Sequence, residues 1–286
     1  MPKRFVTLAW IAAACVYLLI ALGFVVRITG SGLGCGNHWP LCNGRLFPPL
    51  SDPGAVGAVI EWSHRLVAGI VSVLIVALAV LDWRRSITLV GLLVIQIALG
   101  AVTVKTELQP LMVILHLATA MLLLAALIVA ARGVPGSPGL RPGSAVLLAL
   151  TFITVLFGAL TANLGATAAC HGFPLCNGQI VPQGGWLPAI HWTHRLLAYT
   201  LTGYVIWWAA RSRDRAAWRA VAIVIAQIAI AVTMLSLGFA NGLRAAHAAV
   251  GAGVWVTILF VSLKPATVPA AVASASPRGP TLPDTR

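Results

Sequence analysis

The sequence predicts an all-α integral membrane protein of eight transmembrane helices, which form two tandem four-helix bundles related by internal duplication. The first observation is composition: hydrophobic residues make up 59% of the 286 residues and charged residues only 9%. Soluble domains carry about a quarter charged residues, so this chain cannot cover a water-facing surface. The second observation is that similar motifs recur in the two halves of the chain.

Eight apolar runs are long enough to cross a bilayer, which takes about 20 residues of helix. They lie near residues 6–26, 58–81, 87–104, 111–131, 145–165, 188–209, 219–238 and 243–263. The first run follows the basic start MPKRF and resembles a signal peptide. It reaches Val26 without a convincing small-residue cleavage site, so we expect it to remain as the first helix.

The basic residues predict how the chain lies in the membrane. Thirteen of the 19 Lys and Arg residues flank the same side of the expected spans. They are Lys3, Arg4, Arg84, Arg85, Arg132, Arg141, Arg211, Arg213, Arg215, Arg219, Lys264, Arg278 and Arg286. Because cytoplasmic connections are enriched in Lys and Arg, we expect a multi-pass cell-membrane protein with cytoplasmic termini and cysteine-containing loops outside. Basic residues spread between apolar runs indicate membrane lipid as the surroundings, and no nucleic-acid partner, despite the net charge of +13.

Corresponding motifs of the two halves are 130 to 135 residues apart. CGNHWPLCNG (35–44) matches CHGFPLCNG (170–178), and EWSHRLVA (61–68) matches HWTHRLLA (191–198); QIA follows in each half. Units with an even number of spans share one orientation, which gives a parallel repeat. We therefore expect an N-terminal half over 1–132, a Gly/Pro-rich cytoplasmic linker over 133–144, a C-terminal half over 145–264 and a disordered cytoplasmic tail over 265–286.

Four histidines are the main candidates for chemistry. His64, His116, His194 and His247 each lie in the first turns of an even-numbered span, on the side of the large loops. Ionisable groups inside a membrane are costly and mark functional sites. A single helix-end histidine is often only interfacial, but two pairs at repeated positions favour ligands. Two imidazoles on facing helices suit an iron porphyrin, whereas zinc would require three or four ligands.

Glu61 and His191 occupy matching positions, each three residues before a candidate ligand and on the same helix face. A carboxylate in an apolar site can act as an acid or base. The alternative is a glutamate favoured by the dipole at a helix N-terminus. For His191 we favour a hydrogen-bonded supporting role.

Several basic residues lie near the same boundary: Arg27, Arg65, Lys105, Arg195 and Arg244. They are candidates for binding heme propionates, because arginine binds carboxylates through paired donors. The alternative is that their side chains extend to lipid headgroups.

Two cysteine pairs lie in the large loops, Cys35 with Cys42 and Cys170 with Cys176. Disulfides persist on the outer side of a membrane, and these spacings allow closure of a local bond. Such bonds could be structural or could exchange with a substrate thiol. A metal site using His38 or His171 is a weaker alternative, and Cys15 is expected to be a small buried residue.

Taken together, these residues resemble the heme A synthase family. The resemblance rests on Glu61-Trp-Ser-His64-Arg65, His191-Trp-Thr-His194-Arg195, His116, His247 and a cysteine pair in each half, and it covers residues 6–263. It implies an oxidoreductase that oxidises the C8 methyl group of heme O to a formyl group, by two hydroxylations and loss of water. The product, heme A, serves cytochrome oxidase assembly, and heme O synthase would act upstream.

The resemblance also implies a role for each residue. His194 and His247 would bind the iron of a resident heme b. His64 and His116 would flank the substrate heme O, with Glu61 as the essential carboxylate. The cysteines match the form of the family with a pair in each half and are expected to form disulfides.

Two other functions remain open at this point. A diheme b-type cytochrome would use both histidine pairs for electron transfer only, but it would not require a carboxylate in one half alone. A quinone-linked thiol oxidase would use the loop cysteines, but it leaves four intramembrane histidines unexplained. A transporter would show broken helices at mid-membrane, whereas the polar residues here lie at one end.

Overall fold

The computed structural model describes residues 2–48, 51, 54–132, 139–212 and 214–264. Its eight α-helices are α1 (Lys3–Ile28), α2 (Ala55–Leu81), α3 (Trp83–Lys105), α4 (Pro110–Ala131), α5 (Ser144–Asn163), α6 (Trp186–Ser212), α7 (Ala217–Ser236) and α8 (Asn241–Ser262). Two short 3-10 helices follow α1 and α5, namely η1 (Ser31–Leu33) and η2 (Ala166–Ala169). The described part of the chain contains three isolated β-bridges and no strand. Every apolar run of the sequence therefore forms a helix, as predicted.

Seven of these eight helices are long and apolar enough to cross a membrane. The chain is thus an all-α membrane protein, as its composition predicted. The exception is α6, which has sufficient length at 27 residues. Its sequence includes His191, His194 and Arg195, which reduce its apolar character.

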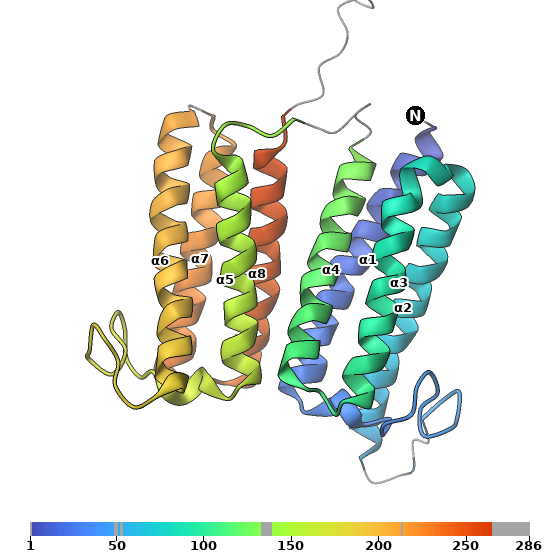
Figure 1. The fold of residues 1–286 in the computed structure, drawn as a ribbon, viewed down its shortest axis with the longest axis horizontal. Coiled ribbons are helices and arrows are strands. Elements are labelled where there is room, and N and C mark those ends of the chain that lie inside the picture. Colours follow the sequence, from blue (N-terminus) through green and yellow to red (C-terminus); the bar gives the residue numbers. More distant parts are fainter. Residues whose placement is uncertain (1, 49–50, 52–53, 133–138, 213, 265–286) are drawn as a thin grey trace, which may run out of the picture.

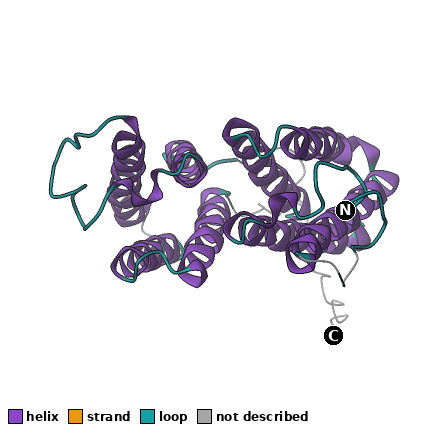
Figure 2. Cartoon of the chain, turned by 90° about the horizontal axis from the view of Figure 1, so that it is seen from below, coloured by secondary structure: helices purple, strands orange, loops and turns teal. Residues whose placement is uncertain are grey.

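The helices lie side by side in two groups, α1–α4 and α5–α8 (Figure 1). The large loops and both 3-10 helices lie at one end of the molecule, which we call the loop end. The N-terminus and the α2–α3 and α6–α7 connections lie at the other end, which we call the terminal end. A view from the loop end shows the two groups next to each other (Figure 2).

Each group is a ring of four helices. In the first group α2 and α4 both pack against α1 and α3, so α2 and α4 occupy opposite corners. In the second group α6 packs against α5 and α7, and α8 does the same from the opposite corner. The candidate histidines all belong to these corner helices, so each pair spans the interior of its own ring.

The apolar core of the first group extends into the second group, which also has a core of its own around Leu147, Val205 and Ile258. Buried side chains of α1, α2, α3 and α4 form a continuous cluster with Ala252, Trp255 and Leu259 of α8. The junction also contains hydrogen bonds: Tyr17 Oη donates to the Ala249 carbonyl at 3.1 Å, and Trp255 Nε1 donates to the Met121 carbonyl at 3.1 Å. At the loop end Arg27 Nε donates to Asn163 Oδ1 at 2.7 Å. The groups are therefore packed together rather than merely tethered.

The linker and tail predictions fall partly or wholly outside the described residues. Of the expected linker 133–144, residues 133–138 lie outside them; residues 139–143 precede α5, and the Arg141 amide donates to the Ser262 carbonyl at 2.9 Å. The expected tail 265–286 lies entirely outside the described residues.

Candidate functional site: paired histidines at the loop end

The four histidines occupy corresponding positions in the two rings. His64 and His194 lie in the third turn of α2 and α6, and His116 and His247 lie in the second turn of α4 and α8. All four are therefore near the loop end, in four part-buried positions.

Glycines on neighbouring helices allow three of the imidazoles to lie directly against helix backbone. A methyl group at Gly23 of α1 would lie 3.3 Å from His64 Cε1, and one at Gly100 of α3 would lie 3.2 Å from His116 Cε1. A methyl group at Gly158 of α5 would lie only 2.9 Å from His194 Cε1. Side chains larger than hydrogen at these positions would push the rings out of place. The bundle is thus shaped around the imidazoles.

The hydrogen bonds to the imidazoles differ between the halves. In the C-terminal half His194 Nδ1 lies 3.0 Å from the Thr154 carbonyl, so it donates there as an N–H. The amide of Gln227 reaches both the ring of His247, at 3.1 Å from Nδ1, and the backbone carbonyl of that residue, at 2.8 Å. The bond from Nδ1 of His194 to a carbonyl fixes that ring and leaves its Nε2 as a metal ligand. At His247 the amide nitrogen of Gln227 lies within 3.4 Å of both ring nitrogens.

In the N-terminal half the imidazoles are less constrained. Gln96 lies 3.2 Å from His116 Nε2, but His64 Nδ1 and His116 Nδ1 are buried without a hydrogen-bond partner among the described residues. Buried polar atoms normally have partners. His64 and His116 lie on opposite helices of the ring, and buried imidazole nitrogens without a partner fit an iron porphyrin as the missing partner, so the residues of this half are compatible with heme.

Glu61 is buried at the loop end of α2 and is 4% exposed. Its Oε2 accepts a hydrogen bond from the Cys35 amide at 2.8 Å, and its Oε1 pairs with Arg65 at 2.5 Å. The matching residue of the other half, His191, is also buried, and its Nδ1 lies 3.0 Å from the Ala166 carbonyl. His191 therefore has the supporting hydrogen bond that was expected of it.

The two arginines that follow the candidate ligands bind loop backbone in this structure. Arg65 Nη1 donates to the carbonyls of His38, Pro40 and Leu41 at 2.9 to 3.2 Å. Arg195 donates to the carbonyls of Cys170, Gly172 and Leu175 at 2.8 to 2.9 Å. These contacts to the loops were not predicted from the sequence, which suggested heme propionates or lipid headgroups for both arginines.

The remaining basic candidates also lie at the loop end. Arg27 and Arg244 are part-buried, and Arg27 contacts Asn163 of the other half. Arg244 donates to Asn241 Oδ1 at 3.0 Å, and Lys105 is exposed at the last residue of α3.

Each cysteine pair is joined by a disulfide, Cys35–Cys42 and Cys170–Cys176. All four of these cysteines are buried. The loops around them share a local structure. Asn43 and Asn177 both have a positive φ, and an isolated β-bridge joins the second cysteine of each pair to the residue three positions later. Cys15 is a free thiol in α1, part-buried rather than fully buried.

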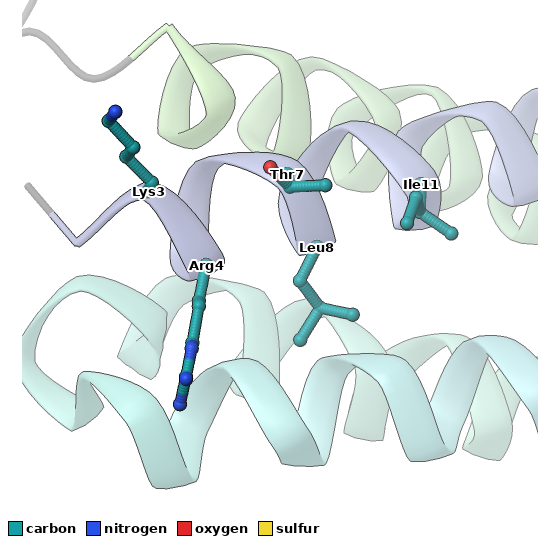
Figure 3. Close-up of a pocket in the computed structure, with 5 residues that line it drawn as sticks. All are labelled: Lys3, Arg4, Thr7, Leu8 and Ile11. Carbon is teal, nitrogen blue, oxygen red and sulfur yellow. The ribbon is translucent and has the colours of Figure 1, made fainter.

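The structure also contains a shallow pocket far from the histidines. It runs along the first turns of α1 and is lined by Lys3, Arg4, Thr7, Leu8 and Ile11 (Figure 3). Because it lies at the terminal end, it contains none of the candidate residues. The histidine pairs remain the candidate site.

Sequence reasoning missed the supports of the histidines. Gln96 and Gln227 were visible as parts of a repeated QIA motif, but no role was assigned to them. Their contacts with His116 and His247 now explain the repeat. Gly23, Gly100 and Gly158 gave no distinct signal, because glycine is common in membrane helices.

Comparisons with known proteins bear on the whole chain. A family model described as cytochrome oxidase assembly protein (COX15-CtaA) matches residues 6–259. The chain is 31% identical to the heme A synthase of Bacillus licheniformis, over 79% of this chain and 85% of that protein. It is 29% identical to the heme A synthase of Alkalihalophilus pseudofirmus, over 92% of this chain and 96% of that protein. It is 31% identical to the heme A synthase of Symbiobacterium thermophilum, over 87% of this chain and 91% of that protein. The resemblance inferred from the motifs is therefore confirmed.

Proposed function

Because this chain belongs to the cytochrome oxidase assembly protein family, we propose that it is a heme A synthase, a membrane oxidoreductase that converts heme O to heme A. The observation that carries this proposal is the repeated histidine pair with a carboxylate, Glu61, in one half only. The family name connects the product to cytochrome oxidase assembly. Heme O synthase is the expected upstream enzyme.

The hydrogen bonds support different roles for the two halves, with resident heme b in the C-terminal half and substrate heme O in the N-terminal half. His194 donates from Nδ1 to a carbonyl that orients its ring, and Gln227 contacts the ring and the backbone carbonyl of His247; positions held in this way suit the permanent ligation of a resident heme b. His64 lacks such a partner at Nδ1 among the described residues, which suits a site where substrate heme O must enter and product must leave. Heme b, when bound between His194 and His247, supplies one-electron redox chemistry.

Glu61 is the proposed catalytic carboxylate. Oxidation of the C8 methyl group of heme O requires protons to leave the substrate as electrons do. Glu61 lies one helical turn from His64, on the substrate side, and can accept such a proton or orient a water. In the resident half the matching position holds His191, whose ring is engaged by the Ala166 carbonyl. The two sites thus share an origin and differ in chemistry.

The proposal includes the topology. The matching rings, with the 3-10 helix, disulfide loop and histidines repeated in order, support a duplicated four-helix unit. We propose α6 as the eighth span, because its partners α5 and α7 enclose it within the second ring. The terminal end carries Arg84, Arg85 and Arg211, which supports placing that end in the cytoplasm and the disulfide loops outside.

Arg27, Arg65, Lys105, Arg195 and Arg244 stay candidates for the heme propionates. Arg65 and Arg195 donate to several loop carbonyls, and Arg27 donates to Asn163 and to the Ala162 carbonyl. Arg244 donates to Asn241 through Nη1 and keeps most of its donors for another partner.

The alternative function is a diheme b-type cytochrome. The discriminating experiment expresses the chain in a host that makes heme O but no heme A, followed by chromatography of the extracted pigments. Appearance of heme A supports the synthase. Heme O that stays unconverted in the presence of bound heme b and an electron acceptor supports the cytochrome.

A further inference from the structure

At the loop end of the N-terminal ring, polar contacts connect Glu61, Arg65 and the Cys35–Cys42 loop. The C-terminal ring has no carboxylate at the matching position, which is His191. Glu61 uses both carboxylate oxygens, one for Arg65 and one for the Cys35 amide. Arg65 in turn holds three carbonyls of the segment between the two cysteines. Helix, carboxylate and disulfide loop are therefore joined through one guanidinium group.

The C-terminal ring shows how the matching disulfide loop is held when no carboxylate is present beside the arginine. Arg195 holds the matching disulfide loop through Cys170, Gly172 and Leu175, and its Nη2 binds the Cys170 carbonyl. In the N-terminal ring Nη2 of Arg65 binds Glu61 instead. The need to hold the disulfide loop explains why both rings have an arginine at this position. It does not explain why Nη2 of Arg65 binds the Glu61 carboxylate, whereas Nη2 of Arg195 binds a loop carbonyl.

We propose that Arg65 is a positioning residue, which holds the Glu61 carboxylate and the Cys35–Cys42 loop as one unit at the rim of the substrate site. The inference rests on the function proposed above. A carboxylate with free rotation would sample several rotamers, whereas bonds to Arg65 and to the Cys35 amide leave one. Orientation of a reacting group contributes strongly to rate, and the paired guanidinium also compensates a charge that is almost fully buried.

Two variants test this role in the full-length protein with heme b bound. Arg65→Gln removes the ion pair and most loop contacts. Arg65→Lys keeps a positive charge, but one ammonium group cannot bind a carboxylate and three carbonyls together. We expect kcat for heme A formation to fall by about 100-fold in Arg65→Gln and by less in Arg65→Lys, with the KM for heme O little changed in both.

Hydrogen exchange supplies a readout that does not depend on turnover. We expect amide exchange in residues 33–45 to rise about tenfold or more in Arg65→Gln, because the lost hydrogen bonds involve a charged donor. Arg195→Gln is the matched control: it should raise exchange in residues 168–179 and leave residues 33–45 as they are. If Arg65→Gln fails to retain heme b, Arg65→Lys decides the question, with raised exchange and reduced kcat expected.

The inference is overturned if exchange in residues 33–45 is unchanged in the arginine variants, or if both variants form heme A at the normal kcat. A loss of activity that appears only as a higher KM would also contradict a positioning role. Failure of the proposed function looks different: the unmutated chain would make no heme A, while the exchange experiment would still report the contacts of Arg65.

Discussion

Glu61 and His191 show how a single position separates two similar sites. Both side chains are buried three residues before a histidine, and both bind the backbone of the segment that follows the preceding helix. The imidazole of His191 can be satisfied by a neutral carbonyl. The carboxylate of Glu61 requires hydrogen-bond donors, and it finds them in Arg65 and the Cys35 amide. The difference in side chain thus changes both the chemistry and the local contacts.

Substitution of the four histidines should separate the two heme sites. His194→Ala or His247→Ala should lower tightly bound heme b in the purified protein, because each removes one of the two iron ligands proposed for the C-terminal half. His64→Ala or His116→Ala should abolish heme A formation and leave most heme b in place. The measurement is heme content by absorbance and pigment extraction. Loss of resident heme b from the His64 or His116 variants alone would reverse the assignment of the halves.

At this scale the sequence predicted residue types better than contacts. The repeated motifs identified the four histidines and Glu61, because each occurs at a fixed place in a recurring pattern. The same motifs could not predict that Arg65 and Arg195 would turn to the loops. That direction depends on how residues 35–42 and 170–176 fold, and their carbonyl positions are set by tertiary structure rather than by local spacing.

Among the glycines that contact a candidate histidine, Gly158 of α5 leaves the least room for an added methyl group. Gly158→Ala should displace the His194 ring, because the added methyl group would lie 2.9 Å from Cε1. Overpacking of this kind costs about 1–3 kcal/mol, and here it acts on a proposed ligand. We expect less bound heme b and a shifted heme absorbance spectrum. Gly203→Ala in α6 is the control, since a methyl group there meets no atom within 4 Å; equal spectra for the two variants would refute the prediction.

The disulfide loops give a second prediction at the scale of elements. Protein isolated without reductant should contain one free thiol, Cys15, because the other four cysteines are paired. Alkylation of the denatured protein followed by mass spectrometry of its peptides measures this. Labelling of Cys35, Cys42, Cys170 and Cys176 without prior reduction would refute the disulfides and would leave the histidine sites unaffected.

For the whole molecule, the apolar composition predicted a helical membrane protein, and the predicted runs agree with the helices to within a few residues. Hydropathy alone was less informative for α6, which carries His191, His194 and Arg195. The packing of the two rings was beyond prediction from one sequence. It depends on particular contacts across the junction, such as Tyr17 with Ala249 and Arg27 with Asn163.

Reporter fusions test the orientation of the molecule. A fusion at Arg85, in the first turn of α3, should report the cytoplasm, and a fusion at Gly184, just before α6, should report the outside. The expectation follows from the concentration of basic residues at the terminal end. A cytoplasmic signal at Gly184 would overturn both the orientation and the oxidising surroundings expected for the disulfides.

The most direct test of the account is the variant Glu61→Gln in the full-length protein. Glutamine keeps the shape of the side chain but removes the charge and the proton acceptor, and its single oxygen can accept only one of the two hydrogen bonds that Glu61 accepts from Arg65 and the Cys35 amide. We expect a folded protein with normal heme b that accumulates heme O or its alcohol derivative and forms little heme A. Glu107→Gln, a second carboxylate at the loop end, is the control and should form heme A normally. Chromatography of the extracted pigments distinguishes the outcomes, and normal heme A from Glu61→Gln would contradict the proposed role of this carboxylate.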